Sequence, residues 1–403
     1  MKILVLAGGF DQIALIHELN CRGHQTVLVD YFENPPAKDV VNKHIVASTL
    51  DVEKVESIAK SEKVDLICTA CTDQALLTVA YVSERLGLPC YISYQVGLNV
   101  TNKSYMKKVL SHNNIPTSKY SVVNRANLNA IKDFVFPLVV KPVDCNSSKG
   151  VMRVDNNNEY IEYVKQAIYL SRTQTAIVEE FKEGKEISAD FYIDNGTVKL
   201  LSATSSLKIR DKNSFAICCS EYPAVNSSQE RKLIEIASQI AKSFSLDNTP
   251  LLVQLIAGHD EMSVIEFSAR MGGGSKYKLI EVLSGVDIMS VYVDRILGGH
   301  PTVNPTKKVD YCKLVYIYCQ PGIFNHVEGF VEMKASKMID DYFVYKTPGM
   351  EICDSKTSGD RPAGYLCTAY SEHELRNKIE YVDSHLKVIS EEGNDIMIHH
   401  LIY

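Results

Sequence analysis

The sequence predicts an α/β and α+β protein with three parts: an open parallel α/β domain, a larger sheet-and-helix region and a small β-rich C-terminal domain. Strand-like apolar runs alternate with amphipathic helical stretches over roughly the first 100 residues, which is the pattern of a parallel sheet. After residue 300 the composition changes to tyrosine-rich strands and one late helix. The length of 403 residues also exceeds what a single hydrophobic core normally spans.

The N-terminal domain is predicted to span residues 1–102. Its first strand, Lys2 to Gly9, is a continuous apolar run of the kind that is buried on both faces of a sheet. The helix that follows ends at Gly23, and the next strand ends at Asp30. Further strands are predicted at 64–71 and 89–93, with helices from about Val52 and Gln74.

Three features of this domain have alternative interpretations. The turn "LAGGFDQ" has a glycine pair and a distal Asp30 but lacks the G-x-G-x-x-G spacing of a dinucleotide site. It is a tight βα turn or, alternatively, a helix N-terminus that faces a substrate anion. Asp73 is either an ordinary first-turn acid or a ligand for a substrate amine. Cys68 and Cys71 form a C-x-x-C pair, but Cys68 lies within an apolar strand, which favours structural thiols over a redox motif.

The second region, residues 103–299, begins with an amphipathic helix. Two strands around a polar hairpin loop follow within 133–154, and long strands are predicted within 175–193 and at 197–207. An amphipathic helix over 229–244 and strands at 250–258 and 262–270 complete the region.

Three lysines stand where they could contact a triphosphate. Lys103 opens the first helix of this region, and Lys141 lies at a strand end, because Pro142 forces an extended backbone there. Lys149 lies in the small-residue loop 145–150, which could cradle phosphates with its N–H groups and hydroxyls and act as a lid. The loop residues predicted to bind ATP are Ser147, Ser148, Lys149 and Gly150.

An acidic stretch at 178–186 follows an apolar strand. Its backbone could meet an adenine edge, and Glu186 could accept hydrogen bonds from ribose hydroxyls. A charged surface turn is the alternative interpretation. The residues assigned here to the nucleotide site are Glu179, Glu180, Phe181, Lys182 and Glu186.

Taken in this order, the motifs resemble the ATP-grasp superfamily of ATP-dependent ligases over about residues 103–299. Within it the chain looks most similar to the carbamoyl-phosphate-synthetase-like and L-amino-acid ligase branches, because of Gln254 and the stretch "ARMGGGS". The resemblance implies a two-part ATP-grasp fold with a lid at about 122–185, which is preceded by a pre-ATP-grasp domain and followed by a C-terminal domain over 300–403. It also places Lys103 and Lys141 on the phosphates.

The resemblance assigns the remaining site residues. Mg²⁺, with Mn²⁺ as an alternative, would be held by Glu266, Gln254 and Ser268, where Ser268 is a weaker ligand than the Asn of most family members. Catalytic roles at the γ-phosphate and the acyl phosphate are implied for Arg270, Lys141 and Lys149. The residues expected to contact substrate are Arg270, Gly272, Gly273, Gly274, Lys208, Arg210 and Asp73; for Lys208 and Arg210 a solvated basic loop is the alternative.

The implied reaction joins a small-molecule carboxylate to an amine. The carboxylate attacks the γ-phosphate of ATP, giving an acyl phosphate and ADP, and the amine then displaces phosphate to form an amide. An amino-acid ligase is expected. The alternatives are an enzyme that forms carbamoyl or carboxy phosphate from bicarbonate, and a non-catalytic ATP-binding module.

Composition and charge argue against some classes of binding partner. The net charge of −6 argues against a general nucleic-acid binder, which needs a basic surface. No apolar stretch approaches the roughly 20 residues of a membrane helix, and the N-terminus is a poor signal peptide. A cytoplasmic protein with reduced thiols is expected, without membrane or nucleic-acid partners. Homodimers are common among enzymes of this shape, but the sequence does not indicate one.

Overall fold

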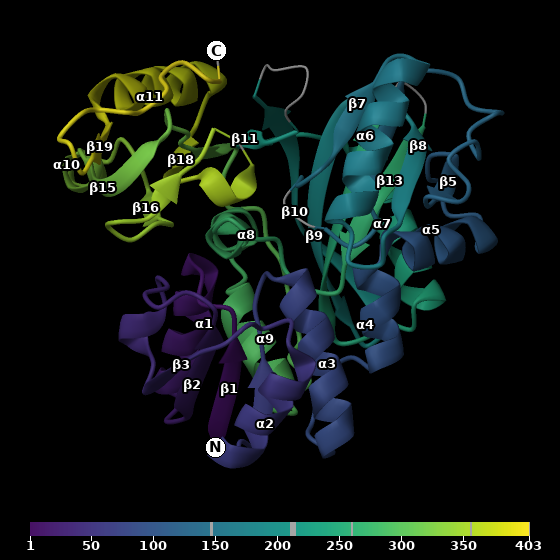
Figure 1. Ribbon diagram of the computed structural model, residues 1–403. Helices are drawn as coiled ribbons and strands as arrows, with labels where there is room; N and C mark the ends of the chain where they lie inside the picture. The colour runs from purple at the N-terminus through teal and green to yellow at the C-terminus, as the bar shows by residue number, and fades with distance from the viewer. Residues whose placement is uncertain (146–147, 210–214, 259–260, 355–356, 403) are drawn as a thin grey trace.

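The structure is a computed structural model that describes residues 1–145, 148–209, 215–258, 261–354 and 357–402. Figure 1 shows the N-terminal elements in purple and blue at one end, a large teal and green sheet region, and the yellow C-terminal elements above the N-terminal ones. The mixed α/β and α+β class predicted from the sequence is confirmed.

The N-terminal part is an open sheet of four parallel strands in the order β3-β2-β1-β4. The chain leaves β1 toward β2 on one side and later returns to β4 on the other, so the carboxyl ends of β1 and β4 form a topological switch point. The elements are β1 (Lys2–Leu6), α1 (Phe10–Cys21), β2 (Gln25–Asp30), η1 (Lys38–Val40), β3 (Lys43–Val46), α2 (Val52–Glu62), β4 (Leu66–Cys68), α3 (Asp73–Leu86) and α4 (Tyr94–Thr101).

The strand predicted at 89–93 is absent, and that expectation was wrong. Gly87 ends α3 in the left-handed conformation, and Pro89 follows two residues later. Ser93 then caps α4 by accepting a hydrogen bond from the Val96 N–H (3.2 Å). The residues between the two caps pair with no described strand, although Ile92 packs into the apolar core.

A second, four-stranded sheet has the order β5-β8-β6-β7 and is entirely antiparallel where its pairs are defined. Helix α6 packs against it through Tyr160, Val164 and Ile168, which gives this sheet its own apolar core. The elements are α5 (Lys103–His112), β5 (Tyr120–Val123), β6 (Leu138–Pro142), β7 (Met152–Val154), α6 (Asn157–Leu170) and β8 (Ala176–Glu180). We call β5 to β8 with α6 the lid.

The central sheet has eight strands in the order β13-β12-β9-β10-β11-β14-β18-β16. Its last three strands come from the C-terminal region, and Cys219 of β11 pairs with Val315 of β14. The sheet is therefore continuous across residue 300, where the sequence predicted a domain boundary. Its elements before that residue are β9 (Lys185–Asp194), β10 (Thr197–Lys208), β11 (Ile217–Tyr222), α7 (Ser227–Ser243), β12 (Thr249–Ala257), β13 (Met262–Ser268), α8 (Lys276–Ser284) and α9 (Ile288–Ile296).

The C-terminal region adds a three-stranded sheet, β17-β15-β19, beside the central one. Its elements are β14 (Tyr311–Tyr316), β15 (Gly322–Glu328), α10 (Phe330–Ala335), β16 (Asp341–Val344), β17 (Glu351–Ile352), η2 (Ser358–Asp360), β18 (Ala363–Ala369), α11 (Glu372–His385) and β19 (Lys387–Ser390). Among the described residues, no helix is both long and apolar enough to cross a membrane.

Helices α8 and α9 connect these parts. Leu15, Ile16 and Leu19 of α1 share one apolar cluster with Met289 and Tyr292 of α9. Figure 1 shows the green helices lying between the N-terminal sheet and the central sheet. The segment between β13 and α8 therefore lies near the carboxyl ends of β1 and β4, where residues from all three regions meet.

Because the sheet is continuous, we expect the central and C-terminal strands to unfold together. Leu314 of β14 is fully buried in a cluster with Leu279 and Leu283 of α8, so Leu314→Ala should lower the free energy of unfolding by about 2–5 kcal/mol. Urea unfolding followed by circular dichroism would measure it, with Val331→Ala at an exposed position as the control. Two transitions, of which Leu314→Ala shifts only one, would show that the C-terminal strands unfold independently.

Candidate active site

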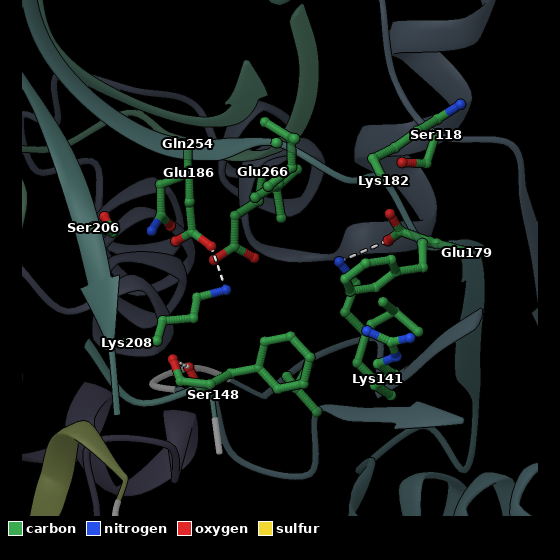
Figure 2. Close-up of a pocket in the computed structure, with 18 of the residues that line it drawn as sticks. Ser118, Lys141, Ser148, Glu179, Lys182, Glu186, Ser206, Lys208, Gln254 and Glu266 are labelled. Carbon is green, nitrogen blue, oxygen red and sulfur yellow. Dashed lines mark hydrogen bonds and ion pairs between the residues drawn. The ribbon is translucent and has the colours of Figure 1, made fainter. Parts of the chain in front are cut away.

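A cavity of about 710 Å³ lies between the lid and the central sheet. Figure 2 shows Lys141, Glu179 and Lys182 from the lid side facing Gln254, Glu266 and Lys208 from the central sheet. Cationic and anionic side chains therefore approach the same space from two independently packed sheets. Most of the residues that the sequence assigned to ATP line this cavity.

Lys141 is held by a carboxylate that lies behind it. Its ammonium group is 2.6 Å from Oε1 of Glu179, whose cross-strand partner is Val139. Because Val139 and Lys141 are two residues apart on β6, they share one face of the lid sheet. The second oxygen of Glu179 lies 2.8 Å from the ammonium group of Lys107, on α5. Glu179 was predicted to serve adenine, but its side chain joins two lysines.

The environment fixes the charge of Glu179. Burial alone would raise the pKa of this carboxyl, but Lys107 and Lys141 outweigh it and lower the pKa to about 2. The carboxylate therefore stays ionised at neutral pH.

Lys103 and Glu266 form the second pair. Asn102 caps α5 by accepting from the Ser104 N–H (3.0 Å), which fixes the start of the helix at Lys103. The Lys103 ammonium group donates to the Cys145 carbonyl (2.9 Å) and lies 3.1 Å from Oε2 of Glu266. Gln254 is the cross-strand partner of Glu266, so both oxygen-bearing side chains enter the cavity from neighbouring strands.

These residues fit a magnesium ion held together with phosphates. The described residues contain no group of three or more potential metal-ligating side chains. Mg²⁺ needs no such cage, because it is usually bound through one or two carboxylates plus substrate phosphates and water. Burial raises the pKa of Glu266 but Lys103 and Lys141 lower it more, so this carboxylate is ionised and suited to the ion. Gln254 offers a neutral oxygen beside it.

Lys208 also lines the cavity, from the end of β10. Its ammonium group lies 2.5 Å from Oε2 of Glu186 and 4.6 Å from the ring centre of Phe215. Lys208 was assigned to the substrate carboxylate, whereas the structure places it in the same cavity as the ATP residues. Glu186, predicted to bind ribose, has this lysine as its partner.

The predicted adenine stretch lines the cavity, but two of its N–H groups are already used. The N–H of Glu180 donates to the Lys119 carbonyl (3.0 Å), and the N–H of Phe181 donates to the Pro137 carbonyl (3.2 Å). The ammonium group of Lys182 lies 3.6 Å from Oε2 of Glu180. We therefore expect adenine to meet backbone groups of residues 182–184.

The predicted phosphate loop is only partly brought to the cavity. Ser147 and Arg210 lie outside the described residues. Ser148 lines the cavity and donates to the Phe215 carbonyl (3.3 Å), whereas Lys149 is exposed and is not part of the lining. Gly150 has φ +72°, and a Cβ there would lie 2.7 Å from Leu170, so only glycine fits.

Arg270 lies beside a smaller adjoining pocket, which Glu266 and Gln254 also line. Its guanidinium group donates two hydrogen bonds to the Asp73 carboxylate: Nε lies 2.7 Å from Oδ1, and Nη2 contacts Oδ2. Burial lowers the pKa of Arg270, but Asp73 raises it more, so the group stays charged. Asp73 therefore has a protein partner already. Ser268 also donates its hydroxyl to Asp73.

These contacts alter two expectations. The hydroxyl of Ser268, predicted to be a metal ligand, donates its proton to Asp73, so that only its oxygen lone pairs could face the ion. The glycine triplet was predicted to let the backbone approach a substrate carboxylate closely, and two of its N–H groups are already engaged: Gly272 N–H donates to Asp190 (3.1 Å) and Gly274 N–H to Asp11 (2.9 Å). The triplet is thus tied to β9 and to α1. No such bond is defined for Gly273.

The turn after β1 is held in place from β2. The N–H of Gly8 donates to Asp30 (2.6 Å), so the distal acid braces the turn. The eleven cysteines, all of which are described, form no disulfide, and Cys68 is buried, as the structural interpretation predicts.

Sequence reasoning missed several residues around the site. They are Lys107, Arg153, Asp11, Asp190 and Lys276. Lys107 alone had a usable signal: it lies four residues after Lys103 on a helix, and such residues share one face. The other four depend on contacts between distant segments.

Glu179→Gln should destabilise the fold by about 3 kcal/mol at neutral pH, because it leaves two buried lysines uncompensated. A free glutamate titrates near 4.5 and Glu179 near 2, so this contribution is complete above about pH 4.5 and lost as the pH falls toward 2. Urea unfolding of both proteins at several pH values would measure it. Glu180→Gln is the matched control, and a difference that stays constant with pH would contradict the assignment.

Comparison with known proteins agrees with this geometry. Residues 101–274 match the family model of the ATP-grasp (A) domain of phosphoribosylglycinamide synthetase. The phosphoribosylamine–glycine ligase of Caldanaerobacter subterraneus subsp. tengcongensis is 23% identical over 419 residues, covering 98% of this chain and 97% of that protein.

Solved structures share the fold over nearly the whole chain. The L-amino acid ligase from Bacillus licheniformis superimposes with a TM-score of 0.79 at 20% identity, over 97% of this chain and 98% of that one. The biotin carboxylase domain of Hydrogenobacter thermophilus 2-oxoglutarate carboxylase, solved with MgADP and bicarbonate, has a TM-score of 0.78 at 16% identity, over 96% and 90%. The predicted use of ATP and Mg²⁺ agrees with these relatives. Residues 101–274 are thus similar to an ATP-grasp domain, and over nearly its whole length the chain shares the fold of these solved structures.

Proposed function

We propose that this protein is a carboxylate–amine ligase that activates an amino acid as an acyl phosphate. The observation that carries the proposal is the convergence of three lysines and Glu266 on one cavity, with the Arg270–Asp73 pair in the pocket next to it. The cavity suits a nucleotide triphosphate, and the adjoining pocket, of about 20 Å³, puts the charged Arg270 beside it.

The cations would neutralise the triphosphate and the charge that develops on the transferred group. Lys103 and Lys141 approach from α5 and the lid, and Lys208 from the central sheet. Glu266 and Gln254 would hold Mg²⁺, which would supply a Lewis acid for the phosphate charge. Because phosphoryl transfer needs little covalent help from protein groups, positioning and charge neutralisation account for most of the catalysis.

The chemistry proceeds in two balanced steps. A substrate carboxylate oxygen forms a bond to the γ-phosphorus of ATP while the bond to the bridging oxygen breaks, and ADP leaves with that electron pair. The amine nitrogen then bonds to the acyl carbon, the carbon–oxygen bond to phosphate breaks, and the amine loses a proton. Arg270 lies in the pocket beside Glu266, where it would stabilise the acyl phosphate.

Two considerations support an amino acid as the carboxylate substrate. The guanidinium of Arg270 and the carboxylate of Asp73 form an ion pair beside the cavity, and a zwitterion would offer each of them a partner of opposite charge in exchange for the other. In addition, one similar protein is named an L-amino acid ligase, and another is named a ligase for glycine.

The proposal predicts release of ADP and phosphate that depends on an amino-acid substrate. The purified protein would be incubated with ATP, Mg²⁺ and pools of amino acids, and products would be identified by mass spectrometry. Glu266→Gln should lower the rate roughly a hundredfold or more, because it replaces the charged metal ligand by a neutral one. Glu261→Gln, an exposed glutamate of the same hairpin, is the matched control.

Other products would identify other functions. Release of AMP and pyrophosphate would contradict the acyl phosphate, because it indicates an adenylate. Phosphate release driven by bicarbonate alone would indicate a carboxy-phosphate-forming enzyme. ATP binding without turnover in any pool would indicate a binding module.

A further inference from the structure

Lys107 is a fully buried lysine that the proposed chemistry leaves unused. Its side chain has no exposed surface, and it is not part of the cavity lining. Its ammonium group lies 2.8 Å from Glu179, 2.6 Å from the Thr117 hydroxyl and 3.2 Å from the Val264 carbonyl. These partners belong to the lid, to the segment that enters the lid, and to β13. Burying a lysine in this way is costly unless its charge is compensated.

Glu179 provides that compensation and shares it with Lys141. One carboxylate oxygen faces Lys107 and the other faces Lys141, which lines the cavity. Two cations and one anion leave a net charge of plus one in this group. Without Lys107, Glu179 and Lys141 would form a neutral pair, and the cavity would lose the positive charge that a triphosphate needs.

We propose that Lys107 is a positioning residue for ATP, which binds the outer oxygen of Glu179 and so keeps the charge of Lys141 available to the phosphates. Lys107 acts through Glu179 and touches no ligand. The inference rests on the proposed function only in that ATP must bind in this cavity. It does not depend on which carboxylate or amine is the substrate.

The contacts of Lys107 also fix where Lys141 points. Thr117 donates to the Val264 carbonyl (2.7 Å), so Lys107 and Thr117 bind the same point on β13. The tether holds Glu179, and through it Lys141, at a set position relative to Glu266 on the same strand. A purely structural cross-link would have this mechanical effect alone, without the effect of charge.

Charge-balanced variants separate these two effects. Lys107→Met should weaken ATP binding roughly ten- to hundredfold, the range expected for loss of one charged contact. The double variant Lys107→Met/Glu179→Gln restores the net charge of plus one and should recover most of that affinity. Lys107→Arg, which keeps the charge, should bind ATP nearly as the wild type does.

The measurement is isothermal titration with ATP and, separately, with adenosine. Adenosine lacks phosphates, so its affinity should not change in any of these variants. Lys108→Met, the adjacent exposed lysine of the same helix, is the matched control and should leave both affinities unchanged. Near-ultraviolet circular dichroism would confirm that each variant is folded.

A double variant as weak as Lys107→Met would overturn the inference, and so would a parallel loss of adenosine affinity. If Lys107→Met alone fails to fold, the double variant and Lys107→Arg still decide between charge and structure. Failure of the wild type to bind ATP would instead refute the proposed function, and the inference with it.

Discussion

The site depends on keeping ammonium groups charged and available inside a protein without leaving them uncompensated. Three lysines of the cavity each lie against one glutamate: Lys141 with Glu179, Lys103 with Glu266, and Lys208 with Glu186. A lysine that is buried alone would tend to lose its proton, whereas a lysine neutralised completely would have little attraction for phosphate. The structure avoids both outcomes by distributing the glutamates over the lid and the central sheet, and by adding Lys107 behind Glu179.

Two facing sheets make it possible to divide the lysine–glutamate pairs between the lid and the central sheet. Each sheet has its own apolar core, so each can present charged side chains on the face that it turns toward the other. The reactive end of the site lies where β13 ends and the N-terminal part begins. There Asp73 of α3 forms an ion pair with Arg270, and Asp11 of α1 accepts a hydrogen bond from the Gly274 N–H. In the proposed function the N-terminal part would thus shape the substrate end of the site, and the lid would contact the nucleotide.

The sequence predicted those parts of the site that local pattern determines. Lys103 at a helix start, Lys141 at a strand end and Glu266 late in an apolar strand were placed correctly in one cavity, because strand and helix ends fix where these side chains emerge. The strand expected at 89–93 does not form because this apolar run has no neighbouring strand to pair with, which the local sequence does not record. The contacts of Gly272 and Gly274 with Asp190 and Asp11 join residues far apart in sequence, and no local pattern records them. The continuity of the sheet across residue 300 is a long-range property of the same kind.

Transfer of an isotope would test the central claim, activation of a carboxylate by phosphoryl transfer, most directly. The substrate found in the pools would be labelled with ¹⁸O in its carboxylate and converted completely with ATP and the amine. Attack of the carboxylate on the γ-phosphorus predicts that one ¹⁸O atom appears in the released phosphate for each amide formed. Label in AMP, or phosphate that contains none, would contradict the acyl-phosphate route.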